Sequence, residues 1–144
     1  LQNRQPIIYG DGEQKRSFSD VDDCIYCIDK LATDPNIKSQ LVNIGPGPEN
    51  EITINKLYQI ISNQLKYNKQ AINKPERVNE VKNAICSSEL SERLLNVKSN
   101  QNIEQIISKM IDFIQKKGPK KFNYNYQIEI QNELTPDTWK KKLI

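Results

Sequence analysis

An arginine follows a glycine-rich turn near the start of the chain, in the stretch YGDGEQKR at residues 9–16. Glycines let the backbone approach a ligand closely, because they carry no side chain. Arg16 comes after this turn and just before a predicted helix, and its planar guanidinium group suits the oxygens of a phosphate. The arrangement indicates a phosphate-binding arginine, and the alternative is a solvated arginine on the surface.

Two further polar side chains stand in stretches that could meet Arg16. Arg77 lies in the polar stretch 74–80, and Asn43 ends an apolar run just before the Gly-Pro-Gly-Pro sequence at 45–48. In open α/β folds, ligands bind at the carboxyl ends of the strands, where such loops gather. Two arginines and an amide that converged there would form a clamp for a diphosphate.

Cys24 and Cys27 have the C-x-x-C spacing of redox and zinc sites. A structural zinc site takes four ligands, and the sequence offers only Cys86 as a further cysteine and no histidine. Both cysteines fall on or beside the apolar side of a predicted helix, which favours buried structural thiols. The spacing is not that of a disulfide framework, so a cytoplasmic location is expected.

The carboxylates Asp20, Asp22 and Asp23 could act in acid–base chemistry or bind a cation. Carboxylates at a helix start also accept hydrogen bonds from free backbone amides and interact favourably with the helix dipole. Helix capping is the preferred interpretation. Because the sequence contains no histidine, histidine bases and histidine-activated nucleophiles are excluded within these residues.

Lysines are interleaved with aromatic residues at 120–126, a pattern that could stack on single-stranded nucleic acid. The chain has 21 basic and 18 acidic residues, and its net charge of +3 is low for a nucleic-acid binder. We therefore expect a half-buried strand with a solvated lysine face, and no nucleic-acid partner. No apolar run reaches the about 18 residues that a membrane span requires, so no membrane partner is expected either.

The apolar patterns predict the elements that must carry these side chains. A short strand at 6–9 stops at the glycine turn, and apolar residues then recur at helical spacing over 21–31. Ser19 or Asp20 would cap that helix. A second short strand is predicted at 41–44, and it ends at the proline-rich loop.

The rest of the chain predicts further helices and one or two more strands. Thr53 should cap a helix, a short strand should follow at 71–72, and Ser87 or Ser88 should open the next helix. A longer helix is predicted over 103–114, and it should stop at Gly118. After it, the sequence predicts a strand or extended arm at 122–130 and a last helical turn capped by Thr135, with Trp139 and Leu143 as its apolar face. Together these elements predict an α/β fold with a few short strands and about four or five helices.

Several stretches resemble the C-terminal half of NAD-dependent nucleotide-sugar epimerases, dehydratases and decarboxylases, the extended branch of the short-chain dehydrogenase/reductase superfamily, in particular its UDP-glucose 4-epimerase-like members. The stretch IIYGDGEQKRSF at 7–18 carries the most specific motif. The runs VNIG at 42–45 and RVNEV at 77–81 resemble the family's YNIG strand and RPxEV loop, in the family's order. The tail from Gly118 to Trp139 is similar to one subset of sugar-epimerase homologues, so the resemblance covers nearly the whole chain.

The resemblance implies that this part of the protein holds the nucleotide-diphosphate end of a nucleotide sugar. It also carries departures: Val78 replaces the usual proline of the second motif, and residues 95–97 replace the family's LGW or LGY segment. The implied substrate-binding positions are Arg16 and Arg77 on the diphosphate, Asn43 near it, Ile7 and Tyr9 beside the base, and Glu80 close to the nucleoside.

The sequence lacks the family's glycine-rich NAD motif and its Tyr-x-x-x-Lys pair. Tyr26 and Lys30 match that spacing, but they lie in a predicted structural helix after the substrate motif, so we reject them. By resemblance, NAD would be bound by a missing N-terminal half, and the chain, which does not start with methionine, would begin inside a longer protein. Residues 1–118 would then form the C-terminal substrate-binding domain, and residues 119–144 an extended arm with a short terminal helix.

The expected parent is a homodimeric, cytoplasmic UDP-sugar 4-epimerase, and the fragment alone would be inactive. Dehydratases and decarboxylases share the same motifs, so they are alternative parents. A non-enzymatic α/β module that binds a nucleotide or a protein is the alternative from another functional class.

Overall fold

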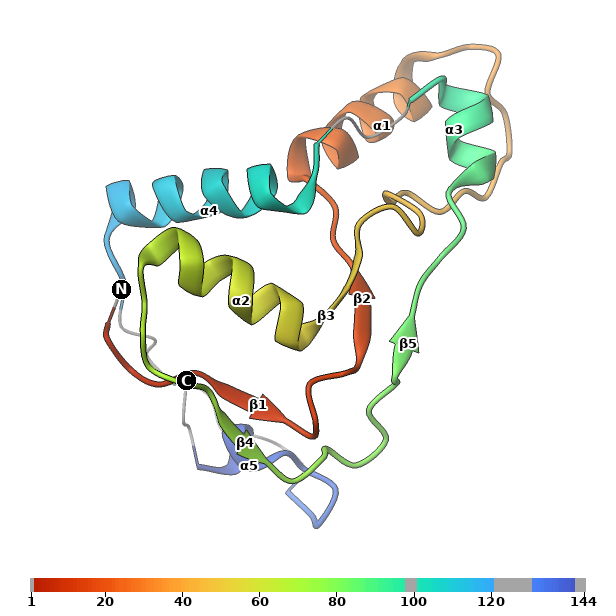
Figure 1. The fold of residues 1–144 in the computed structure, drawn as a ribbon. Coiled ribbons are helices and arrows are strands. Elements are labelled where there is room, and N and C mark those ends of the chain that lie inside the picture. The colour runs from red at the N-terminus through yellow and green to blue at the C-terminus, as the bar shows by residue number, and fades with distance from the viewer. Residues whose placement is uncertain (1, 98–100, 121–130, 142–144) are drawn as a thin grey trace.

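The computed structural model describes residues 2–97, 101–120 and 131–141, which form helices and short strands (Figure 1). The mixed α/β fold class predicted from the sequence is confirmed. The arm expected at 122–130 lies outside the described residues, as does Leu143. The elements in chain order are β1 (Ile7–Tyr9), β2 (Lys15–Ser17), α1 (Val21–Thr33), β3 (Glu51–Thr53), α2 (Ile54–Leu65), β4 (Ile72–Lys74), β5 (Asn83–Ala84), α3 (Glu89–Leu95), α4 (Ile103–Lys117) and α5 (Asp137–Lys140).

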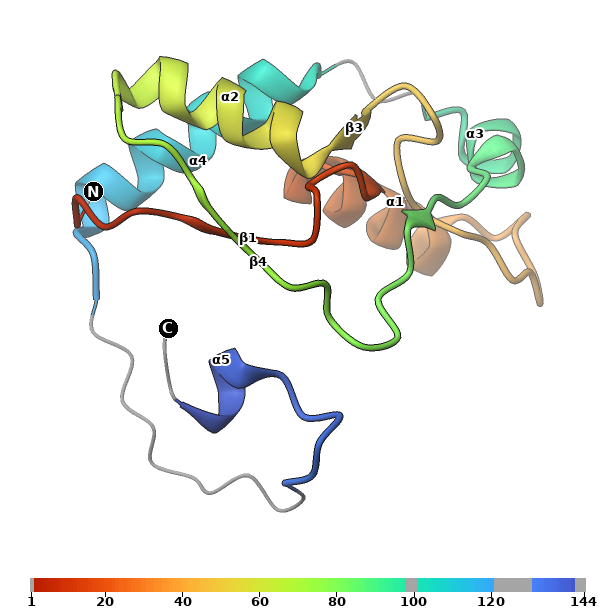
Figure 2. The ribbon, with the colours of Figure 1, turned by 60° about the horizontal axis from the view of Figure 1, so that its bottom comes forward.

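The strands form two small sheets. β1 pairs in parallel with β4, so that Ile7 lies opposite Ile72 and Tyr9 lies opposite Lys74. In the second sheet, β2 lies between β3, which is antiparallel to it, and β5, which is parallel. The segment that joins β1 to β2 and the segment that joins β4 to β5 therefore both pass from the first sheet to the second (Figure 2).

Polar side chains fix the starts of the main helices. Asp20, one of the two predicted caps, accepts a hydrogen bond from the Asp22 backbone at the start of α1. Thr53 caps α2 as predicted, because its hydroxyl accepts from the Lys56 backbone. The cap of α4 is Asn102. These side chains satisfy backbone N–H groups that have no partner within the first turn of a helix.

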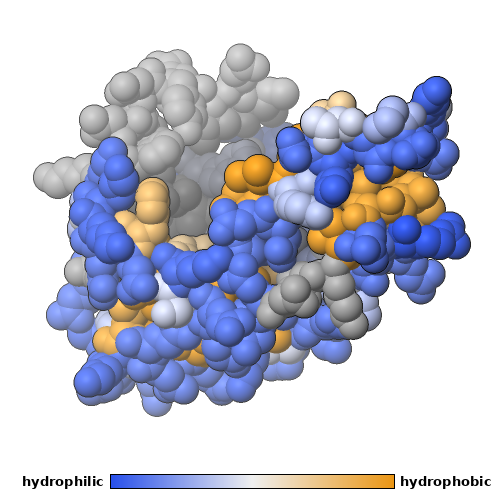
Figure 3. Space-filling view, turned by 90° about the horizontal axis from the view of Figure 1, so that it is seen from above, coloured by the Kyte–Doolittle hydropathy of each residue, from blue (hydrophilic) through white to orange (hydrophobic). Residues whose placement is uncertain are grey.

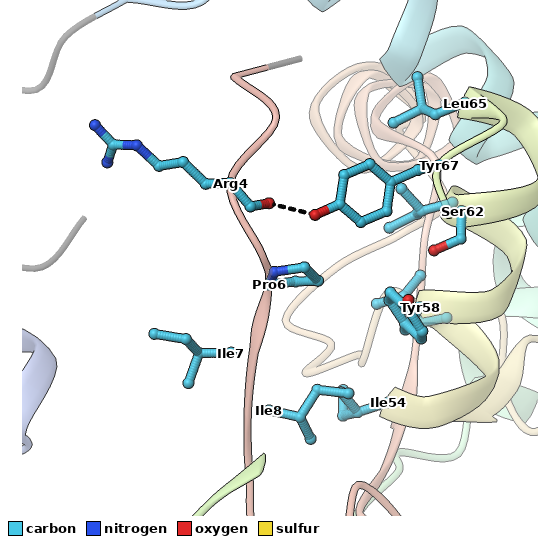
Figure 4. A pocket seen from close by; sticks show the side chains of 11 residues that line it. Arg4, Pro6, Ile7, Ile8, Ile54, Tyr58, Ser62, Leu65 and Tyr67 are labelled. Carbon is cyan, nitrogen blue, oxygen red and sulfur yellow. Dashed lines mark hydrogen bonds between the residues drawn. The ribbon is translucent and has the colours of Figure 1, made fainter. Parts of the chain in front are cut away.

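The main core lies where α2 and α4 pack side by side (Figure 1). Ile60 of α2 and the α4 residues Ile103 and Ile107 are buried there. Burying one such side chain contributes about 1.5–3 kcal/mol. Leu57 and Ile61, which belong to the apolar stripe predicted for α2, pack against this core as well. The stripe as a whole (Ile54, Leu57, Tyr58, Ile61 and Leu65) also lines an apolar groove of about 310 Å³ beside β1 (Figure 4).

The predicted strand at 41–44 is wrong. This segment pairs with no strand among the described residues, and the Leu41 side chain is 93% exposed. An extended segment becomes a strand only where a neighbouring strand satisfies its backbone groups. Trp139 was also predicted to form an apolar face, yet it is 57% exposed in α5. At both places the local apolar pattern has no packing partner that would bury it within the described part of the chain.

α1 turns much of its apolar side outward. Val21, Ile25 and Ile28 are exposed, whereas Cys27 is the residue of this helix that is buried. Figure 3, which looks down on the helices, shows apolar side chains gathered toward the end of the molecule where α1 lies. Within the described part of the chain, no helix has both the length and the apolar character needed to cross a membrane.

Candidate functional site

A hollow of about 310 Å³ opens between the two segments that link the sheets. We call it the strand-end hollow, because it begins where the paired strands β1 and β4 end together. Carboxyl ends of parallel strands are the usual place for ligands in α/β folds. Its lining residues are Tyr9, Gly10, Asp11, Glu13, Gln14, Glu76, Glu80, Lys82 and Asn83.

Arg16 lies on strand β2 rather than in a loop, and its side chain reaches the segment before β5. One guanidinium nitrogen, Nη1, donates to the carbonyl oxygens of Lys15 at 2.7 Å and Lys82 at 3.2 Å. The other, Nη2, lies 3.5 Å from Glu80 Oε1. The Arg16 side chain is 27% exposed and that of Glu80 is 16% exposed, so this pair is only partly solvated. Arg16 thus borders the strand-end hollow through Glu80 and Lys82, which line it.

Arg77 follows β4 and lies over the ring of Tyr9. Its guanidinium carbon is 4.2 Å from the centre of the ring, which is a cation–π distance. Arg77 and Tyr9 also line a second hollow, of about 270 Å³, next to residues 133–136. Tyr9 lines both hollows, whereas Arg77 lines the second one.

Two oxygen atoms at this place are buried without a hydrogen-bond partner among the described residues. They are the Tyr9 hydroxyl and Glu80 Oε2, the carboxylate oxygen that does not face Arg16. A buried polar atom that lacks a partner costs about 1–3 kcal/mol, and such atoms are rare outside functional sites. Both residues line the strand-end hollow, and the unpaired Glu80 oxygen is available there to accept a hydrogen bond from a polar ligand.

The structure brings together four of the six residues predicted for the substrate site. Arg16 pairs with Glu80 and Arg77 stacks on Tyr9, and one member of each pair, Glu80 and Tyr9, lines the strand-end hollow. Asn43 lies elsewhere and donates to the Ser87 carbonyl at 3.4 Å. Ile7 is among the residues at the edge of the apolar groove, but its side chain points away from α2 (Figure 4) and is exposed.

Asn55, at the start of α2, is a residue that sequence reasoning missed. Its amide donates to the Asp11 carbonyl at 2.9 Å and to Glu13 Oε1 at 2.6 Å, while its backbone N–H donates to the Gly12 carbonyl. Gly12 has a φ of +78°, and a Cβ there would meet the Asn55 side chain. Asn55 and Gly12 therefore fix the turn before Arg16 together. An asparagine in the first turn of a helix is too common to signal this role.

Cys24, Cys27, Asp22 and Asp23 lie in α1, directly after its cap Asp20. Cys27 is buried, as predicted, whereas Cys24 is only half-buried and Cys86 is exposed. Burial raises the pKa of the Cys27 thiol. No group of three or more cysteine, aspartate or glutamate side chains within the described ranges is placed to hold a metal ion. Asp20 caps α1, which is the capping role expected for that cluster.

Comparison with known proteins agrees with the resemblance in the sequence. No protein-family model matches the chain. The chain is 38% identical over 81 residues to a putative UDP-glucose 4-epimerase of Methanocaldococcus jannaschii, a match that covers 56% of this chain and 25% of that protein. The chain thus spans only about a quarter of the length of this curated relative.

The fold is shared with solved epimerase structures. The UDP-glucose 4-epimerase of Thermotoga maritima, solved with UDP-glucose, matches 81% of this chain and 36% of its own with a TM-score of 0.73 and 23% identity. The UDP-glucuronic acid 4-epimerase of Bacillus cereus, solved with NAD, matches the same shares at a TM-score of 0.67 and 20% identity.

The chain is therefore similar in sequence to a putative UDP-glucose 4-epimerase, and it shares its fold with solved NAD-dependent epimerases and with an NDP-hexosamine dehydratase. Within this class it resembles the UDP-glucose 4-epimerase-like members, and it spans only part of such a protein.

Proposed function

We propose that this chain is the substrate-binding part of a nucleotide-sugar epimerase, and that it holds the nucleotide diphosphate of a UDP sugar. The observation that carries the proposal is the placement of the Arg16–Glu80 and Tyr9–Arg77 pairs beside the ends of two parallel strands. Arg16 and Arg77 adjoin the strand-end hollow through Glu80 and Tyr9, which line it, and two guanidinium groups suit a diphosphate, which carries at least two negative charges.

Each residue has a distinct role in the proposed complex. Arg16 and Arg77 bind the phosphate oxygens from two adjoining segments. The free Glu80 oxygen accepts a hydrogen bond from a sugar hydroxyl, because this atom is buried and unpaired. Tyr9 borders the base. Ile7 and Asn43 were predicted for the same site, and we keep them in the proposal only at its periphery, because Ile7 lies at the edge of the apolar groove and Asn43 donates to the Ser87 carbonyl.

NAD, which serves as hydride acceptor and donor in this class, does not fit the residues of this chain. A dinucleotide site places a glycine-rich turn at the amino end of a helix, so that backbone N–H groups meet the pyrophosphate. Here the glycine turn at 10–12 leads into β2, and β3 passes into α2 without a glycine. We therefore assign NAD binding and hydride transfer to another part of the protein, and we expect no turnover from this chain alone.

The binding energy supplied here would be remote from the reacting carbon of the sugar. Such energy orients the sugar against the cofactor and so contributes to catalysis without direct participation in the reaction. A charge-assisted arginine–phosphate contact is worth about 1.5–3 kcal/mol, so the loss of one should weaken binding by roughly ten- to a hundred-fold.

Calorimetric titration of the 144-residue chain with UDP and with uridine tests this function. Arg16→Ala should weaken binding of UDP far more than binding of uridine, because only UDP carries the diphosphate. Arg16→Lys should restore part of the affinity, since it keeps the charge but loses the planar fork. Arg93→Ala, at an exposed arginine in the last turn of α3, is the matched control and should change neither affinity. Equal losses for UDP and uridine, or no UDP binding at all, would contradict the proposed function.

A further inference from the structure

The Arg77 side chain receives its position from another segment of the chain. The turn that carries it is closed by the Glu80 backbone N–H, which donates to the Arg77 carbonyl at 3.3 Å. Within this turn Val78 is exposed and Asn79 has a left-handed φ of +61°. The turn therefore packs little against the fold, and the ring of Tyr9 is the contact recorded for the guanidinium group.

Tyr9 is well placed to hold a side chain from the segment that follows β4. It is the last residue of β1, and it lies opposite Lys74, the last residue of β4. The Gly10 backbone N–H donates to the Lys74 carbonyl at 2.8 Å, which continues the pairing past the strand ends. Gln14 Nε2 also donates to the Tyr9 carbonyl at 2.9 Å. The backbone of Tyr9 is thus held by the pairing with β4 and by the hydrogen bond from Gln14, and this fixes the point from which its ring extends.

The same turn also connects the two arginines. Arg77 begins it and rests on Tyr9, while Glu80 ends it and pairs with Arg16. Consequently the relative position of the two guanidinium groups depends on both contacts. An arginine that is already ordered loses less side-chain freedom when it binds a phosphate, and the affinity is higher for that reason.

We propose that Tyr9 is a positioning residue for Arg77: its ring holds the guanidinium group in the orientation that binds a nucleoside diphosphate. This inference rests on the proposed function, because it assumes that Arg77 contacts the diphosphate. It goes beyond that function by giving the Tyr9 side chain a role separate from any contact with the base. Since the ring is what matters, the hydroxyl of Tyr9, which is buried and unpaired, is dispensable for this role.

Titration of the full chain with UDP tests the inference through four variants: Tyr9→Phe, Tyr9→Leu, Arg77→Ala, and Tyr9→Leu combined with Arg77→Ala. Tyr9→Leu removes the ring and should weaken UDP binding by roughly three- to thirty-fold, the range of a cation–π contact. Tyr9→Phe keeps the ring and should restore most of the affinity. In the Arg77→Ala background, Tyr9→Leu should have no more than about a twofold further effect, because the group that it positions is gone.

A second readout does not depend on any ligand. In NMR spectra of the free chain, the side-chain protons of Arg77 should be shifted upfield by the Tyr9 ring, relative to those of the exposed Arg93. The shift should persist in Tyr9→Phe and disappear in Tyr9→Leu. If the wild-type chain shows no such shift, the stack does not exist in solution and the inference is wrong, even where Tyr9→Leu fails to fold.

The outcomes separate this inference from the proposed function. No UDP binding by the wild-type chain would overturn both. UDP binding that is weakened by Arg77→Ala but unchanged by Tyr9→Leu would overturn the inference and leave the function standing. A loss from Tyr9→Leu that is undiminished in the Arg77→Ala background would show that Tyr9 acts through another contact, which also overturns the inference.

Discussion

Lys109 Nζ lies 3.1 Å from Asp20 Oδ2, and the same nitrogen lies 3.1 Å from Asp22 Oδ2. Asp20 caps α1, whereas Lys109 belongs to α4, so the two aspartates and the lysine join the helices across the fold. The Asp20 side chain is buried and half of the Lys109 side chain is exposed. The buried carboxylate is therefore the member of this cluster whose charge matters most for stability.

Because the Asp20 carboxylate takes part in this cluster, the fold should lose stability at acid pH. The pKa of the Asp20 carboxyl is lowered, mainly by the hydrogen bond from the Asp22 backbone and further by Lys109. A carboxyl with a lowered folded pKa stabilises the fold above its unfolded pKa of about 3.9, and this stabilisation is lost as the pH falls through the folded value. Asp20→Asn should lower the free energy of unfolding by about 1 kcal/mol at pH 7 and have little effect near pH 2.

Urea denaturation of the wild-type chain and of Asp20→Asn between pH 7 and pH 2 measures how the free energy of unfolding depends on pH. Asp112→Asn, at an exposed aspartate of α4, is the control and should shift the denaturation midpoint little at any pH in this range. A loss from Asp20→Asn that is the same size at pH 7 and pH 2 would mean that its charge does not contribute.

Gly12 should be far less tolerant of substitution than Gly10, although both have a φ between +74° and +78°. Alanine at either position lowers the free energy of unfolding by about 1–2 kcal/mol, because its side chain is strained in the left-handed region. At Gly12 the new Cβ also displaces the Asn55 side chain and its hydrogen bonds, whereas at Gly10 the nearest atom is Glu76 Cβ at 3.7 Å. Gly12→Ala should therefore cost about 1–3 kcal/mol more than Gly10→Ala.

Thermal or urea denaturation of the two glycine variants provides the comparison. Combining Gly12→Ala with Asn55→Ala should cost less than the sum of the single changes, because the collision is then removed. Strict additivity would show that Asn55 does not fix the turn.

The three cysteines should react with a maleimide in the order Cys86, Cys24, Cys27. Cys86 is exposed, while Cys27 is buried and burial raises the pKa of its thiol, so that less of the reactive thiolate is present. Mass spectrometry of the chain labelled at pH 8 gives the order, and labelling in 6 M urea, where exposure no longer differs, is the control. Fast labelling of Cys27 in the folded chain would contradict its buried place. Stoichiometric zinc that is lost from a Cys24→Ala, Cys27→Val variant would contradict the structural role of both cysteines.

Leu41 should be dispensable for stability, in contrast to Ile107. Leu41→Ser should change the free energy of unfolding by less than about 0.5 kcal/mol, because the side chain is almost fully exposed. Ile107→Ala should lower it by about 2–5 kcal/mol, because it leaves a cavity beside Ile60. Urea denaturation measures both values. A loss of more than about 1 kcal/mol from Leu41→Ser would mean that the segment 41–44 packs against the fold in solution.

The helices could be predicted because their signals are local. Thr53 and Asp20 cap helices where the sequence places a short polar side chain before an apolar run, and Gly118 ends α4 at the expected position. The burial of their apolar sides was harder to predict, because Ile25 and Ile28 of α1 are exposed and the most buried residue of α2 was missed. Ile60, which packs against α4, lies outside the stripe that the spacing favoured.

The strands were harder to predict because pairing is nonlocal. β2 consists of the residues 15–17, Lys-Arg-Ser, which have no apolar alternation, and it exists because β3 and β5 flank it. The reverse holds for 41–44, which has the apolar pattern and no partner strand in the described structure. The candidate site also depends on contacts between residues that are far apart in the sequence. Sequence motifs selected Arg16 and Glu80, but only the paired strands reveal that the two side chains meet.

The pairing of β2 with β5 also has a kinetic consequence. Arg16 and Lys82, which it brings together, are 66 residues apart in the sequence. Contacts between residues so far apart in the sequence form slowly, because closing the long loop between them lowers the chain entropy before the free energy of the contacts can offset that loss. The strand-end hollow should therefore be completed late in folding, after the helices have begun to form. Substitutions around it should mainly accelerate unfolding, whereas substitutions in early-forming contacts would slow folding.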